Sequence, residues 1–216
     1  MPYDGNHLVV TKSNAIVEAS YRLTLQEQRV VLYCVAQVDS RAPLDEQRCF
    51  VVEAGPFREI FGIAQEKVYE ELKDAGKRLF ERKISLVDRD TKHVTLLRWV
   101  SLVRYHKRQG RMTLHFSPEL LPFISELRAR FTSYPLAAVA PLTTSFAIRL
   151  FEILAQYRSL KRRVVSVDQL RSWLDCTETF KRFTDFDRWV IKPSLEQINE
   201  RTMLSVSAQR DRKSVV

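Results

Sequence analysis

The sequence contains one pattern of segments twice, and this internal repeat limits the possible folds more than any other feature. "LTLQEQRVVLYCVAQ" at 23–37 resembles "LTTSFAIRLFEILAQ" at 142–156. "FREIF" at 57–61 corresponds to "LRSWL" at 170–174, and "FERKISL" at 80–86 corresponds to "NERTMLSV" at 199–206. The three pairs keep the same order at offsets of about 113 to 120 residues, which indicates a tandem duplication.

Each copy reads as a long helix, a strand, a short helix, a second long helix and a β-hairpin. In the first copy, a helix over 25–38 follows the N-cap Thr24, with Glu27 in the capping-box position. A β-rich run at 49–52 precedes a short helix that starts at Pro56 and ends at Gly62. The pattern then predicts a helix over 65–82, hairpin strands over 93–116 with a turn near Gly110, and a helix over 119–130 before the connector.

This order of elements is that of the winged helix, a variant of the helix-turn-helix. We therefore predict an α+β fold with two tandem winged-helix domains, residues 1–136 and 137–216. In such domains the second helix enters the major groove of DNA, and the hairpin, or wing, lies along the phosphate backbone.

Composition favours a cytoplasmic protein with a polyanionic partner. The net charge is +9, and 45% of the 216 residues are hydrophobic, enough for a sizeable core. No apolar run approaches the roughly 20 residues that cross a bilayer, and the N-terminus shows no secretory signal. The three cysteines (Cys34, Cys49 and Cys176) are widely spaced, so we expect reduced thiols and no disulfide framework.

The expected reading helix of the second copy is "FKRFTDFDRWVIKPSLEQINERT" at 180–202, an amphipathic helix with a kink at Pro193. We predict that the half before Pro193 enters the groove and that the half after it packs on the core. Its aromatic residues are expected mainly in the core, and for Trp189 a core position is favoured over base stacking. The candidate DNA ligands of this helix are Lys181, Arg182, Arg188 and Lys192.

Further cations are candidates for phosphate contacts, although a solvated helix end is an alternative for the run "YRSLKRR" at 157–163. They are Lys161, Arg162, Arg163 and Arg171 before the second reading helix, and Arg210, Arg212 and Lys213 at the tip of its wing. The reading helix of the first copy offers Lys73, Lys77 and Arg78. Because it begins with Glu66, Glu70 and Glu71, which repel phosphates, we expect it to bind DNA more weakly.

The sequence lacks the catalytic motifs expected of an enzyme that acts on DNA. The four histidines are scattered, and none forms the His-hydrophobic-His pair that a nicking enzyme uses to hold its metal. There is no G-x-x-x-x-G-K-[ST] loop for a nucleotide. We therefore expect a binding protein without a cofactor or metal, and not an enzyme.

Three stretches carry a family resemblance over residues 13–206. "SNAIVEASYRLTLQEQRVVLYCVAQV", "LFERKISL" and above all "FKRFTDFDRWVIKPSLEQINERTMLSV" resemble the iteron-binding initiators of theta-replicating plasmids. The resemblance implies a protein that binds repeated origin sites (iterons) as a monomer and promotes melting of the adjacent DNA. It also implies a dimer, held by the N-terminal domain, that represses its own gene at an inverted-repeat operator.

The resemblance further implies host partners, namely the host initiator, its helicase and chaperones. Lys181, Arg182, Arg188 and Lys192 match the family's C-terminal recognition helix, and Lys73, Lys77 and Arg78 lie on its N-terminal counterpart. This sequence departs from the pattern at its end, because the last wing strand would begin near Lys213 and the chain stops at Val216. Two other readings stay open: a winged-helix transcriptional regulator with no origin role and, less favoured, a DNA-nicking enzyme.

Overall fold

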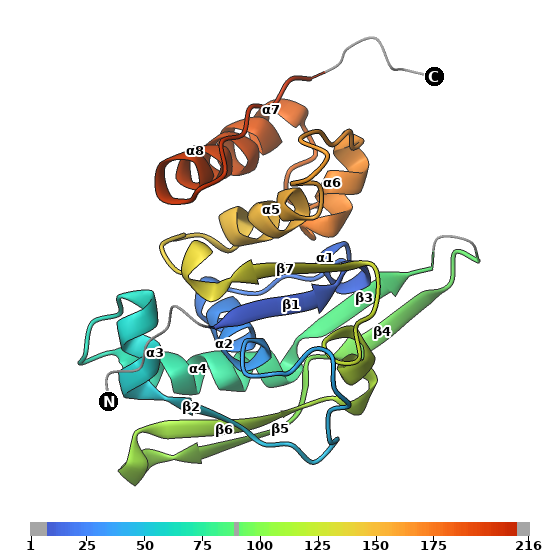
Figure 1. The fold of residues 1–216 in the computed structure, drawn as a ribbon. Coiled ribbons are helices and arrows are strands. Elements are labelled where there is room, and N and C mark those ends of the chain that lie inside the picture. Colours follow the sequence, from blue (N-terminus) through green and yellow to red (C-terminus); the bar gives the residue numbers. More distant parts are fainter. Residues whose placement is uncertain (1–7, 89–90, 211–216) are drawn as a thin grey trace.

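A computed structural model describes residues 8–88 and 91–210 (Figure 1). The N-terminal part forms three small sheets around helices, and the last helices pack together above it in this view. Within the described ranges, no helix is both long and apolar enough to cross a membrane.

The first long helix, α2 (Leu25–Val35), is the centre of the N-terminal core. Thr24 caps it, and the predicted capping box with Glu27 is present: the Thr24 hydroxyl accepts from the Glu27 N–H, and the Glu27 carboxylate accepts from the Thr24 N–H. The turns that follow are buried almost completely, since α2 packs against α4 (Val68–Glu81), β1 and β2. Local capping and tertiary burial therefore favour the same helix.

The winged-helix topology of the first copy is confirmed. β2 (Phe50–Glu53) leads into α3 (Ala54–Phe61), which ends where Gly62 adopts a left-handed conformation with φ 62°. After α4, β5 (Val100–His106) and β6 (Arg111–Phe116) complete a three-stranded antiparallel sheet in the order β2-β6-β5. The turn between β5 and β6, a 3-10 turn at Lys107–Gln109 followed by Gly110, is therefore the wing of this domain.

A second hairpin is inserted between α4 and that sheet. β3 (Lys83–Val87) and β4 (Val94–Arg98) form a separate two-stranded sheet that projects away from the body in Figure 1. α4 itself packs closely on β5 and β6, because a Cβ on Gly76 would lie 2.4 Å from the Met112 sulfur. The predicted β-block thus splits into an inserted hairpin and the winged-helix sheet.

A third small sheet joins the two ends of the N-terminal part. β1 (Val9–Ser13) runs into α1 (Asn14–Val17) and pairs antiparallel with β7 (Phe131–Pro135). The helix predicted over 119–130 is wrong: the chain forms a 3-10 helix at Pro118–Phe123 and then irregular turns. Pro122 lies inside that segment and removes a backbone donor, which disfavours a longer α-helix.

The second copy repeats the helices of the first. α5 (Ser145–Ala155) begins after the N-cap Thr144 as α2 begins after Thr24, and α6 (Val167–Trp173) begins after the N-cap Ser166. The segment at the place of α4 comprises α7 (Phe183–Phe186), a π-helical turn (Asp187–Ile191) and α8 (Lys192–Arg201). α5 packs on α8 on one side and on β7 and α1 on the other.

The predicted wing of the second copy does not form in the part of it that the structure describes. Residues 203–210 contain no strand, and Asn199 instead holds this tail through two hydrogen bonds to the backbone of Val206. The described residues between α5 and α6 also contain no counterpart of β2. A hairpin here would therefore have no sheet to join, which explains the difference from the first copy.

A buried polar network connects β1 and β7 with the helices of the second copy. The Glu152 carboxylate on α5 contacts the Lys12 ammonium on β1 and accepts a hydrogen bond from Tyr134 on β7. Arg149 donates to the backbone carbonyls of Ala19 and Trp173, at 2.9 and 2.8 Å. Burial alone would raise the pKa of Glu152, but the charges of Lys12 and Arg149 hold it below its ordinary value. Since every charge has a partner, the network joins the copies at fixed positions.

Candidate nucleic-acid interface

The α7–α8 segment bends where proline interrupts its hydrogen bonding. Pro193 cannot donate to the carbonyl of Trp189, four residues earlier, and its ring would clash with that carbonyl. The chain widens here into a π turn in which the Lys192 N–H donates to the carbonyl of Asp187, five residues earlier. The segment stays one continuous helix, but residues before the turn face a different direction from that in a regular helix.

The predicted cations of this segment all lie on its exposed surface. Three of them are paired with carboxylates nearby in sequence: Lys181 Nζ lies 3.1 Å from Glu178 Oε2, Arg182 Nε lies 2.9 Å from Asp185 Oδ2, and Lys192 Nζ lies 3.1 Å from Asp187 Oδ2. The last pair spans five residues, a spacing that the π turn brings onto one face. The segment therefore presents cations whose charge is partly compensated within the protein.

Arg188 differs from the other three cations. Its guanidinium carbon lies 5.0 Å from the ring centroid of Trp189, and the described residues provide it with no carboxylate partner. The core position predicted for Trp189 is wrong, because this residue is 60% exposed. Arg188 and Trp189 together form an exposed cation–aromatic pair at the π turn.

The other aromatic residues of the segment pack at its base. Phe186 is fully buried, as predicted, whereas Phe183 is only half-buried. The Arg210 guanidinium carbon lies 4.2 Å from the ring centroid of Phe183, so the structure places Arg210 against the start of α7 and not at a hairpin tip. Arg212 and Lys213 lie outside the described residues.

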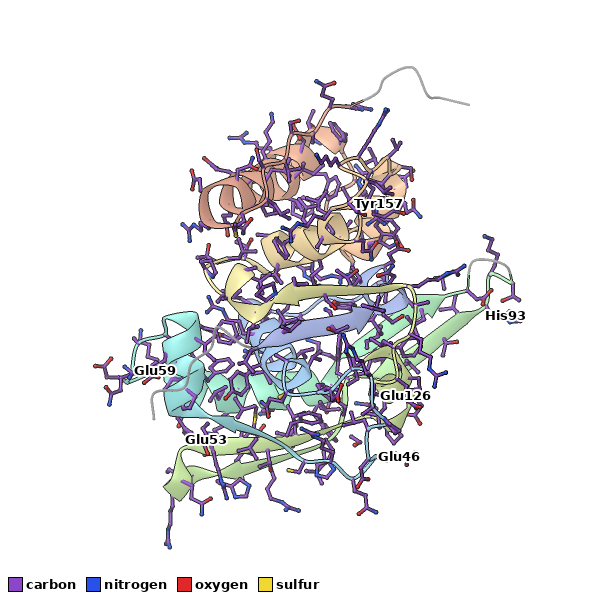
Figure 2. The ribbon with its side chains drawn as sticks, viewed as in Figure 1. Glu46, Glu53, Glu59, His93, Glu126 and Tyr157 are labelled. Atoms are coloured by element: carbon purple, nitrogen blue, oxygen red, sulfur yellow. The ribbon has the colours of Figure 1, made fainter. Side chains whose placement is uncertain are left out.

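The prediction that Arg163 contacts phosphate is contradicted by its position. Its side chain is only 6% exposed, and its Nη2 donates to Glu18 Oε1 at 2.7 Å. The guanidinium also lies over the rings of Tyr157 and Trp173, with centroid distances of 4.3 and 4.6 Å; Figure 2 labels Tyr157 among the helices of the second copy. Arg163 is therefore a structural residue that fixes the turn after α5.

Arg171 is the second correction among the predicted ligands. It is buried on α6, where it donates to Asp168 Oδ1 at 3.1 Å and to the backbone carbonyl of Lys181 at 2.9 Å. The bond to Lys181 connects α6 with the residues just before α7. Arg171 therefore positions the reading segment and is not itself available to DNA. Lys161 and Arg162, in contrast, are exposed in the turn between α5 and α6, as a phosphate contact requires.

The reading helix of the first copy, α4, is tied to α2 at its C-terminal end. Arg78 and Arg82 each donate to the buried Glu27 carboxylate at 2.8 Å. Burial would raise the pKa of Glu27, but these hydrogen bonds and the one from the Thr24 N–H hold it below its ordinary value. Arg78, predicted as a DNA ligand, is therefore engaged within the protein.

Two other predicted cations of α4 remain on its surface. Lys73 pairs with Glu70 at 3.1 Å, and the Glu70 carboxylate raises the pKa of the Lys73 ammonium. Lys77 is exposed and forms no ion pair with the described residues. α4 thus presents fewer free cations than its length suggests.

Sequence reasoning missed the cations of the first wing. Lys107 and Arg108 lie in the exposed turn between β5 and β6, and Arg111 follows at the start of β6. Figure 2 labels Glu53, the strand neighbour of Arg111, at this end of the sheet. The motif "KRQGR" at a hairpin turn was a visible signal for a phosphate-binding wing.

Both copies match models of one protein family. Residues 9–155 match the model described as "Initiator Replication protein, WH1", and residues 166–215 match "Initiator Rep protein, WH2". An Escherichia coli "Replication initiation protein" is 24% identical over 90% of this chain and 63% of that protein, and the E. coli "PI protein" is 26% identical over 85% and 71%. The chain thus spans under two thirds of the length of the first of these relatives.

A solved structure shares the fold. The crystal structure of the Pi initiator protein in complex with iteron DNA matches with a TM-score of 0.80 and 22% identity, over 97% of this chain and 94% of that one. At this level of identity the likeness establishes the architecture, two tandem winged-helix domains.

Proposed function

The chain belongs to the initiator replication protein family, and from that premise we propose that it is a plasmid replication initiator that binds repeated duplex sites at an origin. The observation that carries the proposal is the exposed cationic surface of the α7–α8 segment, at the place of the reading helix in a winged-helix domain. A helix there can offer arginine and lysine to base edges in the major groove.

Two surfaces support a division of roles between the copies. Residues 137–216 carry the proposed reading segment, and residues 1–136 carry the cationic wing, which suits phosphate contacts. α4, with its acidic start and its Glu27 anchor, is proposed as the weaker reader. On this proposal the protein works in the cytoplasm, where host replication factors meet the plasmid.

The inserted β3–β4 hairpin supports a proposal of self-association. Its surface exposes apolar side chains: Val87 54%, Val94 61% and Leu96 64%. Exposed apolar residues on a strand with a free edge favour pairing with a second copy. We propose that this dimer binds an inverted-repeat operator and represses its own gene, while the monomer binds iterons and promotes melting.

A pair of variants of the hairpin tests the self-association. Leu96→Lys should shift the protein toward the monomer in light scattering. The control Thr95→Lys adds the same charge on the adjacent, oppositely directed residue of β4 and should leave the equilibrium unchanged. An unchanged dimer in the Leu96 variant would contradict the hairpin as the dimer surface.

A footprint on the DNA around the gene tests the main proposal. We expect protection of short direct repeats and, at higher protein concentration, of an inverted repeat. A plasmid that carries the repeats should depend on this protein for replication. Protected repeats without that dependence would indicate a transcriptional regulator, and magnesium-dependent nicking of supercoiled repeat DNA would indicate an enzyme.

A further inference from the structure

We infer that three carboxylates, Glu178, Asp185 and Asp187, form a specificity filter that holds the reading cations back from non-specific DNA. This inference rests on the proposed function, because it concerns the choice between repeat sites and other duplex DNA. Each carboxylate occupies one cation of the reading segment, so a duplex has to displace it before that cation can bind.

The geometry matches each carboxylate to its own cation. Glu178 and Asp185 lie three residues from Lys181 and Arg182, and the third pair joins Asp187 to Lys192 across the π turn. The Glu178–Lys181 pair lies just before α7, the Arg182–Asp185 pair lies at the start of α7, and the Asp187–Lys192 pair joins the two ends of the π turn. A helix whose cations served only for attraction to DNA would not need carboxylates at these spacings.

The first wing lacks this arrangement. Within the described part of the chain, no carboxylate lies within ion-pair distance of Lys107 or Arg108. The charges of these two wing cations are therefore available to any phosphate, whereas carboxylates partly compensate the charges of Lys181, Arg182 and Lys192 in the reading segment. The difference matters because non-specific binding consists almost entirely of phosphate contacts.

The filter follows from a competition between two anions for one cation. On non-specific DNA a reading cation exchanges its carboxylate for a phosphate and gains an interaction of similar strength. The displaced carboxylate then repels the phosphates of the DNA backbone. At a correct site the same cation turns from the backbone to the base edges and gains hydrogen bonds there, so its carboxylate no longer competes with a phosphate for it. The carboxylates thus weaken non-specific binding more than binding at a correct site.

Two other roles for these carboxylates predict different results. Asp185 also lies in the first turn of α7, where a negative charge stabilises the helix end, and loss of that role would lower thermal stability. A carboxylate can also accept a hydrogen bond from the amino group of cytosine, and loss of that role would weaken binding to the repeat. Thermal unfolding and binding to two duplexes separate these roles from the filter.

The test compares two variants of the full chain with equal charge. Asp185→Asn with Asp187→Asn removes two filter carboxylates, and Glu196→Gln with Glu200→Gln removes two exposed carboxylates beyond Pro193. The probes are the repeat duplex protected in the footprint and a shuffled duplex of equal length and composition. Affinities are measured at two salt concentrations, with thermal unfolding as the check on folding.

We expect the filter variant to bind the shuffled duplex about 3- to 10-fold more tightly and the repeat duplex by a smaller factor, given the modest strength of exposed ion pairs. Adding Glu178→Gln should increase the effect, and the control variant should change the affinity for both duplexes by the same factor. The inference would be overturned if the filter variant also changed both affinities by the same factor, or if it weakened binding to the repeat duplex alone. If the doubly substituted chain unfolds early, Asp187→Asn alone decides. A wild-type chain that does not discriminate the duplexes would instead overturn the proposed function.

Discussion

The wing of the first copy and the reading segment of the second both present cations to solvent, but they hold those cations differently. In the wing, Lys107 and Arg108 extend from an exposed turn and form no ion pair with the described residues. In the reading segment, Lys181, Arg182 and Lys192 are each paired. Net charge alone therefore does not identify the surface that would read DNA sequence. Unpaired cations suit attraction to any phosphate, and on our proposal paired cations suit discrimination between base sequences.

A third group of cations is excluded from both surfaces by burial. Arg163 and Arg171 belong to the same basic stretch of sequence as Lys161 and Arg162, yet they hold the turn after α5 and the start of the reading segment. Arg163 and Arg171 therefore do not count among the cations that contact DNA. Three sets of substitutions test the difference between the wing and the reading segment.

The largest effect is expected for Arg163→Ala, measured as the free energy of unfolding. The substitution removes the ion pair with Glu18 and the packing of the guanidinium over Tyr157 and Trp173, which should cost about 3 kcal/mol. Arg162→Ala, the exposed neighbour, should change stability by less than about 0.5 kcal/mol. If the Arg163 variant were as stable as the wild type but bound DNA more weakly, Arg163 would instead contact DNA directly.

The next effect is expected for Arg188→Ala, measured as affinity for the repeat duplex. Because Arg188 is not held by a carboxylate, its loss should cost about 1–3 kcal/mol at the repeat and reduce discrimination against altered bases. Arg182→Ala should act in the same direction. Wild-type affinity and footprint in both variants would show that the α7–α8 segment is not the reader.

The smallest effect is expected for Lys107→Ala combined with Arg108→Ala in the wing. The double variant should bind repeat and shuffled duplexes more weakly by the same factor. The slope of log K against log salt should fall by on the order of 0.9 per lost phosphate contact. A selective loss at the repeat would show that the wing also reads sequence.

The helices could be predicted from sequence because their signals are local. Thr24 and Glu27 form a capping box within a few residues of each other, and Gly62 ends α3 through its own backbone conformation. The repeat then placed α5 and α6 by analogy with α2 and α3. Local chemistry was therefore sufficient for the winged-helix order and for the position of the reading segment.

Several corrections have a different origin, because they depend on partners that are distant in sequence. Arg163 finds Glu18 from 145 residues away, which no local pattern reveals. Residues 203–210 form no wing strand, and the described residues between α5 and α6 provide no strand that it could join. For Trp189 a core position was favoured over base stacking because it is a large aromatic residue, and the structure instead exposes it within the π turn.

The number of residues in the π turn also determines the direction in which the cations of α7 point relative to α8. Residues 187–191 hold one residue more than a regular helical turn requires, and the helix runs through without a break. Deleting one of them would leave a continuous helix but rotate everything before it by about 100° relative to α8. A one-residue deletion would thus turn the cations of α7 away from those of α8. It would also turn the buried Phe186 away from the core, so a relative with a shorter turn would need a different side chain to pack at that place.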